Sequence, residues 1–179
     1  SFVRGDSDLQ ILRRAYRDMS DALSGVWHGR DMGLPYETPD ELLTMASIIE
    51  KETSLESERA DIAGVFVRRL QQKWRLETDP TVIYGMGDSY QGNIRRKDLK
   101  TDTPYNTYTR HGLPPTPIAL PGLASLRAAA HPAPGEAMFF VADGQGGHTF
   151  STTLDEHNRA VRVLMNASRI KPDQPGTEE

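Results

Sequence analysis

Three helix-start signals constrain this chain more than any other feature of its sequence. In each signal, a Ser or Thr precedes a Glu or Gln by three positions, so the two side chains can bond reciprocally to the free N–H groups of a first helical turn. The three pairs are Ser7 with Gln10, Thr38 with Glu41, and Thr153 with Glu156. Pro39 follows the second cap, where its fixed φ suits the first helical position. We therefore predict helices directly after Ser7, Thr38 and Thr153.

Apolar periodicity extends these helices and adds two more. Apolar residues recur at helical spacing from Leu9 to Val26, which predicts one amphipathic helix after the first cap. A further helix is predicted over residues 56–74, with Ile62, Phe66, Leu70 and Trp74 on one side, and a short one over residues 123–130.

The strand signals are fewer and lie late in the chain. The β-rich run 137–142, the turn-forming residues 143–147 and the segment 148–152 together predict a hairpin. Residues 76–121 are dense in Pro, Gly, Thr and Tyr and show almost no helical period, so we expect a functional region or short strands there. The order of elements predicts an α+β fold, in which a helix-rich part packs with a small antiparallel sheet and long ordered loops.

Composition excludes several classes of protein. The chain has 179 residues, which suits one domain, and 21 Lys and Arg against 25 Asp and Glu give a net charge of −4. This charge argues against a nucleic-acid partner, which would require a basic face. The absence of cysteine excludes a disulfide scaffold, a thiolate metal site and a Cys nucleophile. The longest purely apolar run, residues 137–142, is too short to span a membrane.

Two carboxylates near the end of the second helix are the first candidates for catalysis. At about 100° per residue, Glu50 and Glu52 fall at opposite edges of a wide apolar arc. A carboxyl that is partly desolvated at such an edge should have a raised pKa, which suits a general acid near neutral pH. The alternative is two exposed glutamates in a fraying last turn, and periodicity alone does not choose between Glu50 and Glu52.

Other polar clusters point to a sugar site and away from a metal. The segment 103–108 joins hydroxyls, an amide and two aromatic rings, a mixture that can stack on pyranose rings and bind N-acetyl groups, although it can also be an ordinary loop. Residues 76–87 start as a turn, and Asp79 with Pro80 can open a short helix. The five His lack metal-binding spacing, and no Ser lies in a hydrolase elbow, so we expect no metal and no cofactor.

Seven segments in order are together similar to the MltG/YceG-like family of endolytic murein transglycosylases, over about residues 38–165. They are Ala46–Thr53 (ASIIEKET), Asp79–Gly87 (DPTVIYGMG), Tyr105–Tyr108 (YNTY), Gly112–Pro115 (GLPP), Ala128–Pro132 (AAAHP), Phe140–Gly144 (FVADG) and Gly147–Phe150 (GHTF).

The resemblance implies an activity and a set of residues. It implies cleavage of the β-1,4 bond between N-acetylmuramic acid and N-acetylglucosamine within a glycan strand, with Glu50 as general acid and base. Glycan-binding residues implied by the same motifs are Ser47, Asp79, Tyr84, Tyr105, Asn106, Tyr108 and His148. Two alternatives stay open: a muramidase that uses water, with Glu52 or Asp79 as second carboxylate, and a non-catalytic glycan-binding or scaffolding module.

The resemblance also implies a context for the chain. Members of the family carry an N-terminal membrane span, so we expect a piece of a single-pass protein that works at the periplasmic face of the inner membrane. Its expected partners are peptidoglycan strands and the penicillin-binding proteins that polymerise them. We expect an N-terminal helix and linker over residues 1–37, the catalytic domain over 38–170 and a flexible tail over 171–179.

Overall fold

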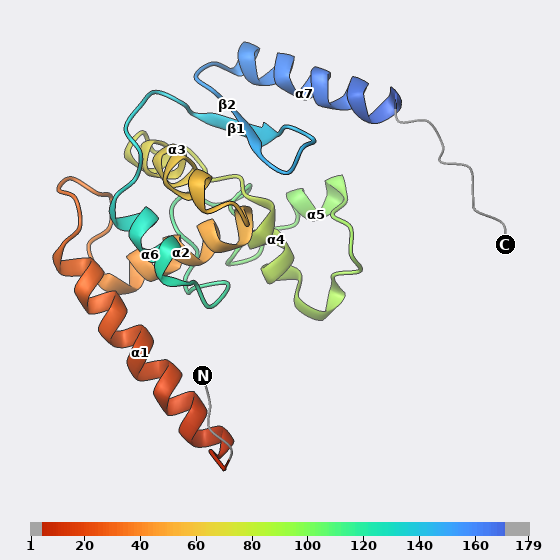
Figure 1. Cartoon of the computed structure of the whole chain (residues 1–179). Helices are drawn as coiled ribbons and strands as arrows, with labels where there is room; N and C mark the ends of the chain where they lie inside the picture. The colour runs from red at the N-terminus through yellow and green to blue at the C-terminus, as the bar shows by residue number, and fades with distance from the viewer. Residues whose placement is uncertain (1–4, 171–179) are drawn as a thin grey trace, which may run out of the picture.

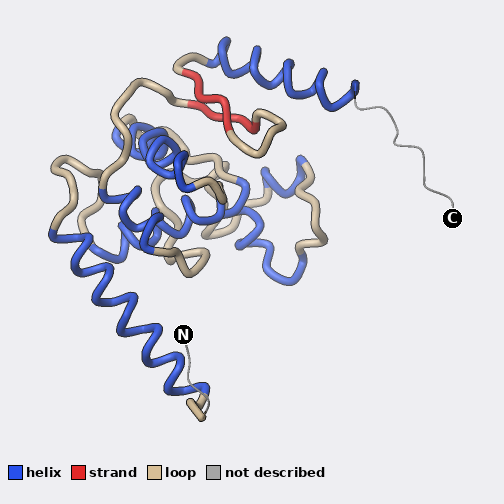
Figure 2. Tube along the Cα trace, in the orientation of Figure 1, coloured by secondary structure: helices blue, strands red, loops and turns tan. Residues whose placement is uncertain are grey.

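The computed structural model describes residues 5–170 and is an α+β fold, as predicted (Figure 1). Helices dominate, and two short strands form one sheet in this part of the chain (Figure 2). The elements are α1 (Asp8–His28), α2 (Pro39–Glu52), η1 (Glu56–Glu58), α3 (Arg59–Gln71), α4 (Asp79–Met86), η2 (Gly87–Ser89), α5 (Arg96–Lys100), α6 (Leu123–Ala130), β1 (Phe139–Ala142), β2 (His148–Ser151) and α7 (Leu154–Ile170). The predicted tail over 171–179 lies outside the described residues.

All three predicted helix starts are confirmed. The Ser7 and Thr38 hydroxyls each accept a hydrogen bond from the backbone of the third helical residue, and the side chain of that residue bonds back to the cap. Thr153 and Glu156 exchange the same pair of bonds, at 3.3 and 3.1 Å, at the start of α7. The caps position helices, and the packing of those helices then decides the fold.

Helix α2 is the centre of the core. It packs against α6, α3 and α1, and most of its wide apolar arc is fully buried. Its buried apolar residues are Leu42, Met45, Ala46, Ile48 and Ile49, whereas Leu43 is half-buried. Because neighbours cover the middle of α2, the polar residues that reach the surface lie near its two ends.

The predicted helix over residues 56–74 is shorter than expected at both ends. Residues 56–58 form a 3₁₀ turn, and α3 ends at Gln71. Lys73 adopts a left-handed backbone with φ 58°, which stops the helix. Trp74 then leaves the helical stripe and packs edge-on against Phe139, with ring centroids 5.8 Å apart.

The predicted hairpin is confirmed. Strands β1 and β2 are antiparallel, with Phe139 opposite Ser151 and Ala142 opposite His148. Helix α7 packs on both strands and α3 contacts β1, so the sheet lies between two helices. Arg68 and Arg69 of α3 donate to the carbonyls of residues 137 and 138, which ties the sheet to the helical part.

Residues 76–121 contain short helices and turns, and the described structure has no strand there. The predicted helix at Asp79 is confirmed as α4, with Pro80 in its first turn. In the rest of the segment, backbone carbonyls find partners in local turns and in buried side chains. The expectation of short strands is therefore wrong, while that of an ordered loop region is confirmed.

Helix α1 leaves the body of the molecule along its N-terminal half (Figure 1). Its C-terminal half packs on the core through Met19, Leu23 and Val26, whereas Leu12 and Tyr16 are exposed. Among the described residues, no helix is long and apolar enough to cross a membrane.

Candidate active site

Glu50 lies at the junction of α2 and α6. One oxygen, Oε2, accepts the backbone N–H of Gly122 at 3.0 Å and the hydroxyl of Ser125 at 2.6 Å. Arg59 approaches the other oxygen at 3.9 Å, and the side chain of Glu50 is 29% exposed. Gly122 is the N-cap residue of α6, so Glu50 supplies from another helix the acceptor that the third helical residue of a capping box usually provides.

These donors lower the pKa of Glu50 below its ordinary value. The hydrogen bond from Ser125 is the largest cause, and it outweighs burial, which raises the pKa; Gly122 and the charge of Arg59 act in the same direction as Ser125. The prediction of a raised pKa at Glu50 is therefore wrong. Its position at the edge of the apolar arc was identified correctly, but the donors come from α6, more than 70 residues later.

Glu52, the last residue of α2, has different surroundings. It is partly buried, and the hydroxyl of Thr78 donates a short hydrogen bond to its Oε1. Burial raises the pKa of Glu52 above its ordinary value, and the charge of Asp79 adds to this effect. The bond from Thr78 and the charges of His148 and Arg69 oppose it without cancelling it. Of the two carboxyls, Glu52 is therefore the more easily protonated.

Glu52 lines a cavity of about 490 Å³ between the helical part and the sheet. The walls come from α2, α3, the segment before α4, both strands and the start of α7. Polar and ionisable side chains in the wall are Glu52, Arg69, Glu77, Asp79, Tyr108, His148 and His157, and apolar ones include Leu76, Phe139, Phe140 and Val141. Polar groups beside aromatic rings match the surface chemistry of a carbohydrate.

Three of the predicted glycan-binding residues meet in this cavity. Tyr108 donates its hydroxyl to Asp79 Oδ1 at 2.6 Å, and both side chains line the wall near Glu52. Burial and the bond to Asp79 raise the pKa of Tyr108, so its phenol stays protonated. His148 joins them from the first position of β2.

Ser47 and Asn106 are buried and have structural partners, which corrects their predicted glycan-binding role. Ser47 is fully buried; its hydroxyl donates to a carbonyl within α2 and accepts the backbone N–H of Ile118 at 2.9 Å. Asn106 is 1% exposed, and its amide nitrogen donates to three carbonyls in and just after α5, over residues 98–101. Both side chains hold the loop region together.

Tyr84 and Tyr105 form a pair outside the cavity. Their ring centroids are 4.7 Å apart, and the hydroxyl of Tyr105 lies 2.7 Å from that of Thr116. Tyr84 is 45% exposed, so an aromatic surface is present on this side of α4. Their predicted contact with glycan stays a prediction, at a position separate from the cavity of Glu52.

Sequence reasoning missed Arg69 and Glu77, which lie beside Glu52 in the cavity wall. Arg69 is almost fully buried on α3, and its guanidinium donates to the carbonyls of Met138 and Leu76, both at 2.8 Å. Glu77 has φ 53°, a left-handed conformation that is rare for a residue with a side chain. The polar residues 77–79, around the predicted start of a helix, could have indicated a role for Glu77. No sequence pattern indicated one for Arg69.

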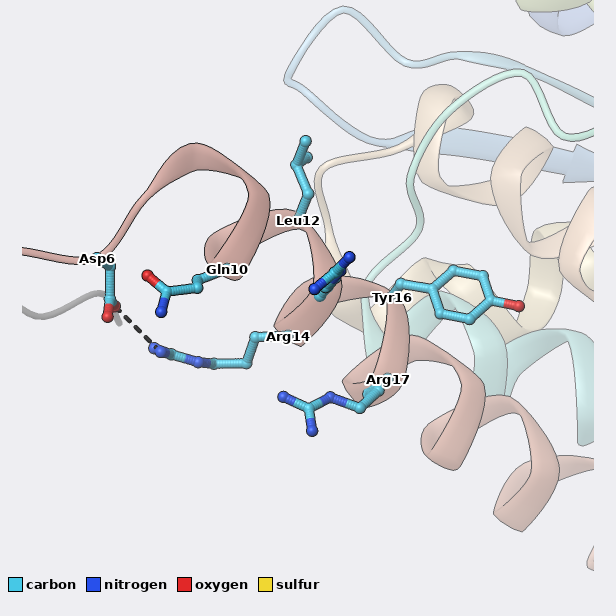
Figure 3. Close-up of a pocket in the computed structure, with 7 residues that line it drawn as sticks. Asp6, Gln10, Leu12, Arg14, Tyr16 and Arg17 are labelled. Atoms are coloured by element: carbon cyan, nitrogen blue, oxygen red, sulfur yellow. Dashed lines mark hydrogen bonds and ion pairs between the residues drawn. The ribbon is translucent and has the colours of Figure 1, made fainter.

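A second hollow, of about 670 Å³, lies beside the N-terminal half of α1 (Figure 3). Its wall comes from α1 and the segment before it, and Arg14 pairs there with Asp6 at 3.0 Å. One helix cannot enclose a substrate, so the cavity of Glu52 is the better candidate site. Within residues 5–170, no group of three or more His, Asp or Glu side chains could hold a metal ion.

Comparison with known proteins gives the family. The sequence matches the YceG-like family over residues 1–163, and the chain belongs to this family. A Bacillus subtilis (strain 168) protein named endolytic murein transglycosylase is 47% identical over 130 residues, which are 73% of this chain and 36% of the relative. A Streptococcus pneumoniae protein of the same name, from serotype 2 strain D39, is 33% identical over 135 residues, or 73% of this chain and 24% of the relative.

A solved structure supports the same assignment. The crystal structure of a yceG-like protein from Listeria monocytogenes is similar with a TM-score of 0.65 and 38% sequence identity; the match covers 84% of this chain and 45% of that one. The chain therefore has the YceG-like fold and spans less than half the length of each of these proteins.

Proposed function

We propose that this chain is the catalytic part of an endolytic peptidoglycan lytic transglycosylase, with Glu50 as general acid and base. Family membership and the names of the relatives support the reaction class. The observation that carries the assignment of chemistry is the position of Glu50, the first glutamate of the motif Glu-Lys-Glu-Thr, at the junction of α2 and α6 with its side chain 29% exposed. The substrate is the bond from N-acetylmuramic acid to N-acetylglucosamine inside a glycan strand, and the cavity lined by Glu52 would bind another part of the same strand.

The reaction needs one carboxyl because the nucleophile belongs to the substrate. Protonated Glu50 gives its proton to the glycosidic oxygen as the bond from that oxygen to C1 breaks. The C6 hydroxyl of the same muramic acid then attacks C1, and its proton passes to the Glu50 carboxylate. No water is consumed and the product ends in a 1,6-anhydro ring. The intramolecular attack has a high effective molarity, which offsets the lack of a second protein carboxylate.

The family motif and the surroundings of the two carboxyls favour different glutamates of the same turn. The resemblance assigns the catalytic acid to Glu50, which accepts two hydrogen bonds from α6 and has a lowered pKa. The surroundings of Glu52 favour its protonated form. The hydrogen bonds of a catalytic carboxyl change when substrate binds, so those of Glu50 do not exclude it as the acid. We therefore propose Glu50 and keep Glu52 as the competing candidate.

A matched pair of variants tests this proposal. Purified peptidoglycan strands are treated with the wild type, Glu50→Gln and Glu52→Gln, and the products are analysed by mass. We expect anhydro ends from the wild type, a loss of at least about 10²-fold in turnover for Glu50→Gln, and a smaller loss for Glu52→Gln. The amide oxygen that Glu50→Gln introduces can keep both bonds from α6, so the fold should survive. The reverse ranking would transfer the catalytic role to Glu52.

Asp79 in the same cavity favours a muramidase as the second candidate function. In that reaction Asp79 would act as the second carboxylate, as glycosidases that use water require. Reducing ends in place of anhydro ends would support this alternative. Full retention of glycan binding with no product would instead indicate a binding module.

We also propose a cellular context for the full-length protein, which rests on the family resemblance. It would act at the periplasmic face of the inner membrane, beside the penicillin-binding proteins that polymerise glycan. Crosslinking of the tagged full-length protein in cells, followed by membrane fractionation, tests both parts. Recovery in the soluble fraction without crosslinks to a glycan polymerase would contradict the proposal.

A further inference from the structure

Glu58, in the 3₁₀ turn before α3, makes two hydrogen bonds to a single residue of the distant sheet. Its Oε1 accepts the backbone N–H of His148 at 2.8 Å, and its Oε2 lies 2.8 Å from Nδ1 of the same residue. Both side chains are largely buried, at 16% exposure for Glu58 and 14% for His148. The hydroxyl of Thr53 is a third, longer contact at 3.4 Å. Glu58 therefore holds both the backbone and the ring of His148.

The glycine-rich turn between the strands makes this double contact possible. A Cβ atom on Gly147 would lie 2.7 Å from Glu58 Oε1, closer than real Cβ atoms approach, and 3.0 Å from Asp143 Oδ2. Asp143 fixes the turn by accepting the backbone N–H groups of Gln145 and Gly147. The lack of a side chain at Gly147 therefore lets Glu58 approach β2, which is more than a hairpin turn alone requires.

This contact determines which ring nitrogen of His148 carries the proton. An ionised carboxylate only accepts hydrogen bonds, so Nδ1 must be the donor, and in the neutral ring Nε2 keeps its lone pair. Burial raises the pKa of Glu58, but the hydrogen bonds from the ring and backbone of His148 outweigh it and the pKa is lowered, which favours the carboxylate.

The other side of the imidazole is available to a ligand. His148 lines the cavity of Glu52. Phe140 packs edge-on against the ring, with centroids 5.3 Å apart, and restricts its rotation. Within residues 5–170, the structure gives Nε2 no hydrogen-bond partner. An oriented acceptor thus lies in the cavity wall.

We propose that Glu58 is a positioning residue, which fixes His148 in the Nδ1–H form so that Nε2 accepts a hydrogen bond from a glycan hydroxyl bound beside Glu52. The proposal rests on the function proposed above. It assigns to Glu58 no contact with the substrate, and it gives the glycine-rich turn a part in building the site.

The first test reads the tautomer directly and needs no activity. Nitrogen-15 NMR of the His148 ring, at a pH where the ring is neutral, should show a protonated Nδ1 and a bare Nε2 in the wild type. Glu58→Gln keeps the size of the side chain but replaces one acceptor oxygen by an amide donor, so the proton should move to Nε2. The control is Glu56→Gln, an exposed position in the same turn, which should leave the tautomer unchanged. A protonated Nε2 in the wild type, or an unchanged tautomer in Glu58→Gln, overturns the proposal.

The second test asks whether Glu58 acts through His148. Turnover on peptidoglycan strands should fall about tenfold in Glu58→Gln, the loss expected for one hydrogen bond to substrate, and stay unchanged in Glu56→Gln. In a His148→Gln background, Glu58→Gln should cause little further loss, because interacting residues are non-additive. A full additional loss in that background would mean a structural role and would overturn the proposal. An inactive wild type with the expected tautomer would overturn the proposed function, and with it the glycan role of Nε2.

Discussion

Glu50 and Glu52 lie two positions apart in the last turn of α2, yet their surroundings move their pKa values in opposite directions. Two positions correspond to about 200° around a helix, so the two side chains leave α2 on opposite sides. Glu50 faces α6, which donates two hydrogen bonds, and Glu52 faces the cavity with one donor, Thr78. The same chemical group is therefore held by donors at the start of α6 on one side and lies in the cavity wall on the other.

This difference shows that desolvation at the edge of an apolar arc does not by itself determine the direction in which the pKa of a carboxyl shifts. Both glutamates lose water there, and burial raises the pKa of each. What separates them is the number of donors that the rest of the chain brings to the carboxylate. A helix N-terminus is a strong source of such donors, because its first N–H groups lack partners within the helix.

The largest effect that separates the two sites is the alkaline limit of activity. Since the acid must be protonated, turnover should fall about tenfold per pH unit above its pKa in the substrate complex. Ser125→Ala removes the largest cause that lowers the pKa of Glu50, so with Glu50 as the acid the limit should move to higher pH in this variant. Initial rates of anhydro-end formation from about pH 4 to about pH 8 measure the limit.

Glu52→Gln is the control for this profile. Its rates should fall in the same pH range as those of the wild type, because Glu50 is intact. A limit that moves in Glu52→Gln but not in Ser125→Ala would contradict the assignment of the acid to Glu50.

The fold was largely predictable because its signals are local. The capping residues Thr38 and Thr153 and the turn after Ala142 act within a few positions, and all of these elements are confirmed. The failures have local causes as well. Lys73 adopts a left-handed conformation that a lysine does not predict, so the predicted end of α3 lies too late in the chain.

The site was less predictable because its contacts join distant segments. Asp79, Tyr108 and His148 were identified from their motifs, and they do meet in one cavity. Asn106 looked like a sugar ligand because an amide in a polar loop can bind either a substrate or the loop itself, and only burial decides between the two. Glu58 resembled any other acid of a 3₁₀ turn, since its partner lies 90 residues later.

A smaller effect, on stability, tests the capping role of Glu50. Ser125 is fully buried and donates to Glu50 at 2.6 Å, so Ser125→Ala removes a hydrogen bond to a charged group. We expect a loss of about 1–2 kcal/mol in the free energy of unfolding. At this size 1 kcal/mol corresponds to about 2–4 °C in Tm, which thermal unfolding resolves.

The exposed helical residue Ser24, in α1, provides the matched control, because Ser24→Ala changes no side-chain hydrogen bond among the described residues. Its free energy of unfolding should stay within about 0.5 kcal/mol of the wild type, the usual range for surface substitutions. A Ser125→Ala variant that is as stable as Ser24→Ala would show that the bond to Glu50 contributes nothing. A large fall in turnover would instead connect α6 with catalysis.

The smallest effect is the pH dependence of stability, where the two glutamates should differ in sign. A carboxyl whose pKa is raised in the folded state destabilises that state once the pH exceeds the unfolded-state pKa, and fully so above the folded-state pKa. The Tm of Glu52→Gln relative to the wild type should therefore increase from about pH 4 to about pH 8. A carboxyl of lowered pKa stabilises the folded state above the unfolded-state pKa, and this contribution disappears as the pH falls through the folded-state pKa. Glu50→Gln should therefore lose Tm at about pH 7 and recover toward the wild type at about pH 3.

Measuring both differences in one protein removes the effects of net charge, because each variant loses one negative charge at neutral pH from the same helical turn. Any general effect of that charge appears in both curves, so only the opposite slopes report the local surroundings. Two curves with slopes of the same sign would mean that the surroundings of the two carboxyls shift their pKa values in the same direction. The donors at Gly122 and Ser125 would then not outweigh the burial of Glu50, and the difference between the two carboxyls that the structure indicates would be lost.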